Sequence, residues 1–290
     1  MKRIVFFLLS LVLSLFAEEQ KPPRLLIVTG EPEYGSHETM ARLGSLLKDE
    51  HGFAVTHLRA KQAEGEGHHI PGLSESLGET DLLLFYVRFL VLPAEEVKAL
   101  GEYFDKGGAF IAVRTSTHPF RYPEGSELED ENESFPVRYF GTSYRGHHGH
   151  QTSQINFVMA LDHPIMRGVD LRFWTPDFLY GTNPLSGQVT PPMIGQGLDG
   201  VGRAKLEDEE GEGFLKRNHC RTISEGDASR ITGTPHPVAW TIENEGRGFV
   251  STIGARESFA NPSVVRLYLN AAFWCLGREE EIPAKGLFAK

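Results

Sequence analysis

The sequence predicts an α/β fold in which helices cover both faces of a mostly parallel, doubly wound sheet, with a less regular C-terminal half. Two observations predict it. Four short stretches, at residues 24–30, 53–58, 81–87 and 109–113, are largely apolar, as expected of strands buried on both faces. Amphipathic helical segments follow the first and the third of them, and strands that alternate with helices typically form a parallel sheet.

The first strand is the run RLLIVTG at residues 24–30, which a glycine closes. A helix follows, because Met40, Leu43, Leu46 and Leu47 recur at helical spacing. Gly52 lies just past this pattern and stops the helix. Pro93 begins a second amphipathic helix, which ends at the glycine pair 107–108 before the fourth strand.

The second half contains fewer periodic segments. Residues 154–159 alternate like a half-buried strand, and residues 237–254 predict a hairpin with its turn at 245–246. A final helix over residues 262–276 places its apolar side chains on one face. Residues 195–234 are rich in Gly and charged side chains and predict a long excursion over the surface.

The first seventeen residues differ in kind from the rest of the chain. Lys2 and Arg3 precede an apolar run that ends at Ala17, which is typical of a secretory signal peptide. The run is shorter than the ~20 residues that span a bilayer, so cleavage is expected to leave no stable membrane span and a secreted or periplasmic chain. An uncleaved membrane anchor is the alternative. The predicted division is signal 1–17, spacer 18–23, one domain 24–277 and tail 278–290.

Composition narrows the function classes. The 29 Lys and Arg against 39 Asp and Glu give a net charge of −10, which argues against nucleic acid as a partner. The chain has 12 His and only 2 Cys, at positions 220 and 275. Any metal would therefore be held by His and carboxylate, and outside the cytoplasm the two cysteines could pair.

Ligands of open α/β sheets bind at the carboxyl ends of the strands, and three polar stretches are predicted there. The candidate substrate-binding residues of the first two stretches are Glu31, His37, Tyr86 and Arg88. The alternative for Arg88 is a surface cation. The third stretch leaves the fourth strand as RTSTH at residues 114–118. Its Arg114 follows five apolar residues, and a buried guanidinium needs an anion or several acceptors.

The strongest local signal is the sequence YRGHHGH at residues 144–150. A neutral imidazole serves either metal binding or acid–base chemistry near pH 7. Neighbours in one loop cannot all face one point, so at most two of His147, His148 and His150 are expected to converge. A solvent-exposed loop is the alternative.

Other features favour structural roles. The run DHPI at residues 162–165 is typical of a turn fixed by side-chain hydrogen bonds. Six histidines sit in strand or surface contexts that suggest no special function: His51, His57, His68, His69, His219 and His236. The chain has no Ser or Cys nucleophile elbow and no phosphate-binding loop with its lysine.

Several short motifs follow one another along the chain. They are TG at 29–30 with His37 beyond, YVR at 86–88, GG at 107–108, RTSTH at 114–118, FG at 140–141, GHH at 146–148, DHPI at 162–165, LY at 179–180, PVAWT at 237–241, GRG at 246–248 and NAAFW at 270–274. Together these motifs cover nearly all of residues 24–277, and through them the chain resembles the ThuA-like (trehalose utilisation) family. That family's fold is flavodoxin-like and similar to class I glutamine amidotransferases.

The resemblance implies carbohydrate catabolism, associated with sugars oxidised at C3, and a small carbohydrate as partner. It does not imply glutaminase activity, because that activity needs a cysteine after the fourth strand, where this chain has Arg114 and Thr115. Many relatives have His at the position of Arg114, so the metal-binding role inferred for the family does not carry over residue by residue.

The first hypothesis is an enzyme that acts on a keto-sugar or a glycoside by hydrolysis, elimination or isomerisation. His118 or His148 would be the base, with Arg114 or a divalent metal such as zinc, held by His118 and His148, as the electrophile. Tyr86, Arg88 and Tyr180 would orient hydroxyl groups, with Glu31, His37 and His147 as further substrate-binding residues. The alternatives are a non-catalytic carbohydrate-binding module and metal capture by His37, His118 and His148.

Overall fold

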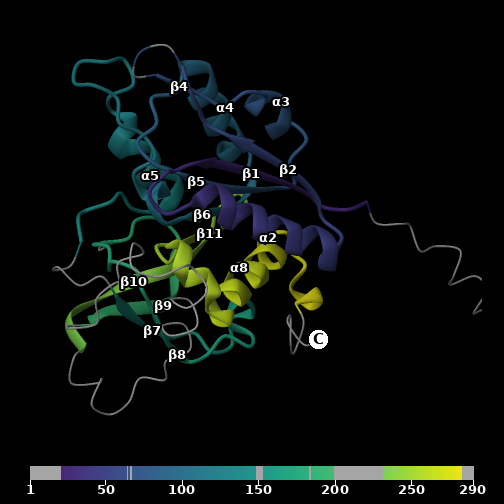
Figure 1. The fold of residues 1–290 in the computed structure, drawn as a ribbon, viewed down its shortest axis with the longest axis vertical. Helices are drawn as coiled ribbons and strands as arrows, with labels where there is room; N and C mark the ends of the chain where they lie inside the picture. The colour runs from purple at the N-terminus through teal and green to yellow at the C-terminus, as the bar shows by residue number, and fades with distance from the viewer. Residues whose placement is uncertain are drawn as a thin grey trace, which may run out of the picture.

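The computed structural model describes residues 21–63, 65, 67–147, 153–182, 184–198 and 231–282. They form an α/β fold around one nine-stranded mixed sheet with the strand order β2-β1-β5-β6-β11-β10-β9-β7-β8 (Figure 1). The predicted α/β class is therefore confirmed, with a large mixed sheet of which the predicted parallel strands form one part.

Half of this sheet is parallel. Its five strands are β2 (Ala54–Arg59), β1 (Arg24–Gly30), β5 (Leu82–Val87), β6 (Ala109–Val113) and β11 (Arg247–Ser251). β1 pairs with β2 on one side and with β5 on the other, so that Thr29 lies opposite both Arg59 and Tyr86. Parallel pairing brings the carboxyl ends of these strands to one edge, and the residues that follow each strand meet there.

The other half of the sheet is antiparallel and more regular than the sequence predicts. It consists of β10 (Ile231–Glu243), β9 (Val189–Leu198), β7 (Gln154–Val158) and β8 (Arg172–Thr175). β10 pairs with both β9 and β11, which joins the two halves into one sheet. The predicted surface excursion over 195–234 is thus wrong at both ends, because β9 continues to Leu198 and β10 begins at Ile231.

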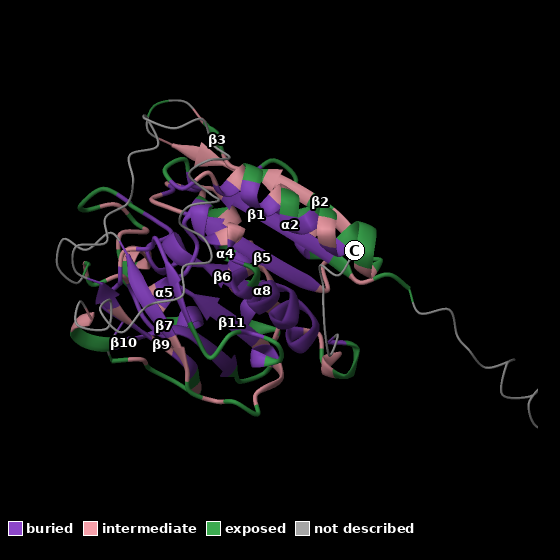
Figure 2. Cartoon of the chain, turned by 60° about the horizontal axis from the view of Figure 1, so that its bottom comes forward, coloured by how far each residue is buried: buried purple, intermediate pink, exposed green. Residues whose placement is uncertain are grey.

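Helices cover both faces of the parallel half. α2 (Ser36–His51) and α8 (Pro262–Cys275) pack on one face, and α3 (Leu73–Leu77), α4 (Ala94–Asp105) and α5 (Glu131–Phe140) pack on the other (Figure 1). Alternate strand residues enter the two cores, with Ile27 on the α2 side and Val28 on the α4 side. The central strands are almost wholly buried, whereas β2 at the edge is partly exposed (Figure 2).

Most predicted elements of residues 24–113 are confirmed, including the left-handed Gly52 that ends α2 and Pro93 before α4. The β7 strand, the β10–β11 hairpin and the final helix α8 are confirmed as well. Among the described residues, six helices and strands are not predicted by the sequence: α3, α5, β8, β9, and the small hairpin of β3 (Lys61–Gln62) and β4 (His68–His69).

Several predictions fall on residues outside the described ranges. They include the signal peptide, Cys220, His148 and His150. Cys275 is a buried free thiol, whose Sγ lies 3.3 Å from the carbonyl oxygen of Phe110. Among the described residues no helix is long and apolar enough to cross a membrane.

Candidate functional site

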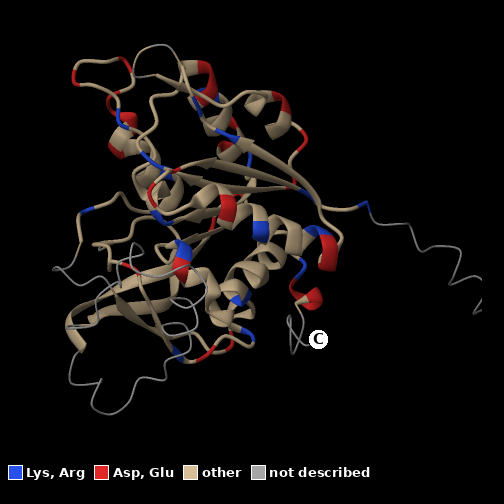
Figure 3. Cartoon of the chain, viewed as in Figure 1, with Lys and Arg blue, Asp and Glu red and all other residues tan. Residues whose placement is uncertain are grey.

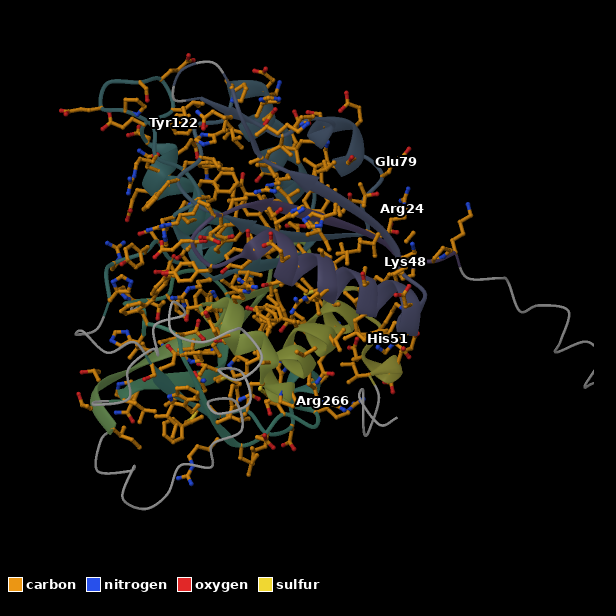
Figure 4. All side chains as sticks on the ribbon, in the orientation of Figure 1. Arg24, Lys48, His51, Glu79, Tyr122 and Arg266 are labelled. Carbon is orange, nitrogen blue, oxygen red and sulfur yellow. The ribbon has the colours of Figure 1, made fainter. Side chains whose placement is uncertain are left out.

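The candidate site lies at the carboxyl edge of the parallel strands. Arg24 at the start of β1 and Tyr122 beyond the end of β6 are labelled on opposite sides of the molecule, so the edge is the Tyr122 side (Figure 4). Open α/β sheets bind ligands at this edge. Two adjoining features occupy it: a polar hollow beyond β1 and β2, and a cluster of aromatic and histidine side chains beyond β6.

The hollow has a volume of about 360 Å³. Its polar lining residues are Thr29, Glu31, Ser36, His37, Arg59, Gln62, His68 and Arg88. They come from the ends of β1, β2 and β5, the start of α2 and the β3–β4 hairpin, so three neighbouring strand ends contribute to one cavity. Its size is at the lower end of the range typical of small-molecule sites, about 300–1,000 Å³.

Thr29 joins two histidines beside this hollow. Its Oγ1 lies 3.3 Å from Nδ1 of His37 and 3.0 Å from Nε2 of His57, and the two imidazole rings are 4.5 Å apart. Burial, followed by the charges of His37 and Arg59, lowers the pKa of His57 to about 4. His57 is therefore neutral near pH 7, and Nε2 of His37 is left for a ligand in the hollow.

The segment after β5 links the hollow to the aromatic cluster. Arg88 forms an ion pair with Glu33, and its guanidinium lies 4.5 Å from the centre of the Phe89 ring. Phe89 has a φ of 53°, a left-handed conformation that non-glycine residues rarely adopt. Its amide donates to the carbonyl of His118, and the two rings are 5.0 Å apart.

Arg114 is the second strained residue of this edge. It directly follows β6 with a φ of 46°, and it is completely buried, as the sequence predicts in part. Its Nη1 donates to Oδ1 of Asp177 at 2.7 Å and to the carbonyl of Thr252 at 2.9 Å. The guanidinium lies between the rings of Tyr34 and Tyr180, at 4.2 and 4.8 Å from their centres.

Beside Arg114, two histidines and two tyrosines form the aromatic cluster: His118, Tyr144, His147 and Tyr180. The ring of His118 lies 4.4 Å from that of Tyr144 and 5.9 Å from that of Tyr180. The hydroxyl of Tyr144 lies 3.0 Å from Nδ1 of His147. Because Tyr180 touches both Arg114 and His118, these two predicted residues flank the same ring.

The electrostatics of the cluster favour neutral imidazoles. Burial, followed by the charges of Arg88 and Arg114, lowers the pKa of His118 to about 3. Burial and then Arg114 lower the pKa of His147 as well. Burial raises the pKa of Tyr144, so its hydroxyl keeps its proton. At neutral pH the cluster thus offers neutral imidazoles and phenols next to a buried cation.

The predicted residues take up different positions at this edge. His37 and Arg88 line the hollow, while His118, His147 and Tyr180 form the cluster. Glu31 also lines the hollow, but its carboxylate accepts the backbone N–H of Tyr34 at 2.9 Å, and burial raises its pKa. These contacts stabilise the turn that leads into α2.

Tyr86 is not among the residues that line the hollow. It is fully buried, and its hydroxyl donates to the carbonyl of Gly254 at 2.8 Å. Burial raises the pKa of this hydroxyl well above its usual value. Within the described residues, Tyr86 therefore contributes to the interior contact between β5 and the turn after β11.

The described residues do not supply a metal-binding set. Protein zinc sites use three or four side chains, and no three His, Cys, Asp or Glu side chains converge in the described part of the chain. His148, one of the two predicted ligands, lies outside that part. The described side chains alone therefore do not supply the three or four ligands of a zinc site.

The sequence alone does not predict a role for three residues of this edge. His57 and His68 were assigned no special function, yet His57 contacts His37 and His68 lines the hollow. The register of β2 could have placed His57 beside β1, because Ile27 lies opposite it. Asp177 lies far from β6 in the sequence, and no local pattern pairs it with Arg114.

His163 shows the expected structural role for the run at 162–165. Its Nδ1 accepts the backbone N–H of Ile165 at 3.3 Å, ahead of a short 3₁₀ turn. The side chain that fixes this turn is therefore His163 itself.

Comparison with known proteins agrees with this fold. A structure from Bacteroides uniformis described as ThuA-like is 14% identical, with 90% of this chain and 94% of that chain covered and a TM-score of 0.58. A second one, from Parabacteroides merdae, is 14% identical, with 88% and 90% covered and a TM-score of 0.60. No curated protein matches the chain. The family model ThuA, described as trehalose utilisation, matches residues 24–275, and the chain therefore belongs to the ThuA family.

Proposed function

We propose that the chain acts on a keto-sugar or a glycoside, through hydrolysis, elimination or isomerisation. On a substrate that carries a ketone, the reaction begins with removal of the proton next to that ketone. One observation carries this proposal: Arg114 and His118 flank the ring of Tyr180, at the edge of the sheet that holds the polar hollow. A neutral base and a nearby cation are what such a proton transfer needs. The trehalose-utilisation description of the family supports a carbohydrate as substrate.

The lining of the hollow suits a sugar. The imidazoles of His37 and His68 and the guanidiniums of Arg59 and Arg88 offer hydrogen-bond partners in several directions. The ring of Phe89 adds an apolar surface beside them. Sites that bind small molecules combine such an apolar surface with a few placed polar groups.

In this proposal His118 is the proton acceptor. Its Nδ1 lies 3.3 Å from Oγ1 of Thr117, which leaves Nε2 to take the proton. The electron pair of the broken C–H bond moves to the ketone oxygen and forms an enolate. The guanidinium of Arg114 is buried and does not contact a substrate. Its positive charge therefore lowers the energy of the enolate through space.

The same proposal includes a doubly wound sheet architecture and a location outside the cytoplasm. The parallel strands have the order β2-β1-β5-β6-β11 with helices on both faces, which supports a doubly wound, flavodoxin-like and amidotransferase-like architecture. The N-terminal sequence supports a secreted or periplasmic chain.

The test is turnover of a 3-keto-glucoside and of 3-keto-trehalose by the purified chain, followed by mass spectrometry. We expect product from the wild type and a loss of about a hundredfold or more in His118→Asn, the scale of general base catalysis. His51→Asn is the matched control, since His51 lies at the far end of α2 (Figure 4). Absence of product from the wild type, with and without added zinc, would refute the proposal.

A second function, sugar binding without catalysis, is favoured by one observation. A pKa of about 3 makes His118 a weak base in the unliganded chain. Calorimetry with the same sugars separates the two functions. Binding without turnover supports the non-catalytic module, whereas turnover that His118→Asn abolishes while binding persists supports the enzyme.

A further inference from the structure

The hollow differs in charge from the rest of the molecule. The chain as a whole has a net charge of −10, and acidic side chains mark the outer helices α3 and α4 (Figure 3). Two guanidiniums, those of Arg59 and Arg88, line the hollow, together with the imidazoles of His37 and His68. The only carboxylate among its lining residues is that of Glu31.

This carboxylate does not neutralise the two guanidiniums. Both oxygens of Glu31 accept the backbone N–H of Tyr34 at 2.9 Å, and the side chain is buried beneath the turn before α2. Its contacts are therefore with backbone donors of its own turn.

The two guanidiniums are available to different degrees. No described carboxylate forms an ion pair with Arg59. Arg88 forms an ion pair with Glu33 through one terminal nitrogen, Nη1. Its Nε is buried without a hydrogen-bond partner. A buried donor without a partner is costly, and a ligand oxygen would remove that cost.

The strand register places the backbones of the two arginines on either side of one strand end. Arg59 lies opposite Thr29 at the end of β2, and Arg88 directly follows β5, with β1 between them. Neighbouring strands are about 4.8 Å apart, so the two backbones are separated by about 10 Å, a span across which two long arginine side chains can reach the same anionic group. The imidazole of His37 lies over the strand between them, with its Nε2 available.

From this arrangement we infer that the hollow binds an acidic sugar, one that carries a carboxylate or a phosphate group, with Arg59 and Arg88 on the anionic group and His37 on a ring hydroxyl. Guanidinium groups bind carboxylates and phosphates through paired, charge-assisted hydrogen bonds. The inference rests on the proposed function, since it assigns the substrate class of the same site. According to this inference, the hollow binds a neutral sugar more weakly than an acidic one.

The experiment is calorimetric titration of the full chain with glucose, glucuronate, glucose 6-phosphate and inorganic phosphate at low and at raised sodium chloride. We expect at least one acidic sugar to bind about tenfold or more tightly than glucose, with an affinity that falls as salt is added. Glucuronate and glucose 6-phosphate separate the carboxylate from the phosphate as the anionic group.

Arg59→Gln and Arg88→Gln are each expected to weaken binding of the acidic sugar about tenfold or more, the scale of a charge-assisted hydrogen bond. Arg172→Gln is the matched control, because it removes the same charge from an exposed position on β8, at the other end of the sheet. Thermal unfolding of each variant shows whether it is folded.

The other outcomes separate the two proposals. Equal affinity for glucose and both acidic sugars overturns this inference and leaves the proposed function standing. Inorganic phosphate that binds as tightly as the sugar phosphate also overturns it, because the hollow would then recognise an anion and no sugar. Absence of binding by both acidic sugars overturns this inference as well, while turnover of the 3-keto substrates decides the proposed function separately.

Discussion

Nη1 of Arg114 lies 2.7 Å from Oδ1 of Asp177, and both side chains are completely buried. Asp177 also accepts the backbone N–H groups of Gly254 and Ala255 and the hydroxyl of Ser258. This one carboxylate therefore ties the turn after β6 to the turn after β11. The ion pair thereby fixes Arg114, the cation of the candidate site, against the turn after β11.

Asp177→Asn is expected to destabilise the fold strongly. Removing one partner of a buried ion pair leaves the other charge uncompensated, which costs about 3–5 kcal/mol. The free energy of unfolding, measured by urea titration, should fall by an amount of this order. Asp81→Asn, which breaks the exposed pair with Arg24, should cause a much smaller loss. Equal losses in the two variants would contradict this account of Asp177.

Gly254→Ala tests the close packing around Arg114. A Cβ at this position would lie 2.8 Å from Cβ of Arg114 and 2.9 Å from Cγ1 of Val113. Overpacking of this kind typically costs about 1–3 kcal/mol, so the melting temperature should fall. Gly78→Ala is the control, because its nearest contact would be 3.5 Å, an ordinary distance. A melting temperature unchanged in Gly254→Ala would show that the strained turn can relax.

Thr29→Val tests the bridge between the two histidines at the hollow. The substitution keeps the shape of the side chain and removes the Oγ1 that lies within 3.3 Å of both His37 and His57. We expect about tenfold weaker sugar binding by calorimetry, because His37 loses the contact that orients its ring. Thr80→Val removes a hydroxyl bonded to Ser76 in the distant α3 region and should leave binding unchanged. Equal effects of the two variants would remove the role assigned to the bridge.

The stability of the chain should depend on pH through His118. Its pKa is about 3 in the folded chain, against the usual value of 6.5. Between these values the unfolded chain binds a proton that the folded chain does not, so stability increases with pH and is lost as pH falls from about 6.5 toward 3. His57, with a pKa of about 4, acts in the same direction.

The melting temperature should therefore be lower at about pH 5 than at about pH 7.5, and the difference should be smaller in His118→Asn. If the melting temperature changed with pH by the same amount in the variant and in the wild type, the burial of His118 would not be the cause of the change.

The sequence predicts the parallel half of the sheet well because its strands are short, apolar and separated by clear helix stops such as Gly52 and Pro93. It predicts the antiparallel half less well. β9 and β10 contain several Gly, Pro and Thr residues, which are typical of loops, and their pairing across more than thirty intervening residues is a long-range property.

In the candidate site, too, the sequence predicts local features and does not predict long-range contacts. That Arg114 and His118 follow a buried strand is a local feature, and the sequence predicts their position. The partner of Arg114 is Asp177, 63 residues further along the chain, and only tertiary packing brings the two together. The positive φ of Phe89 and of Arg114 is likewise imposed by surrounding contacts, because neither residue type favours it.

Proton exchange next to the ketone tests the central claim most directly, because hydrolysis, elimination and isomerisation would all begin with it. The chain is incubated with a 3-keto-glucoside in deuterium oxide, and deuterium at the neighbouring carbons is followed by nuclear magnetic resonance. We predict incorporation by the wild type at a rate about a hundredfold or more above that of His118→Asn. Incorporation at the same rate with wild type, His118→Asn and protein-free buffer would contradict the account.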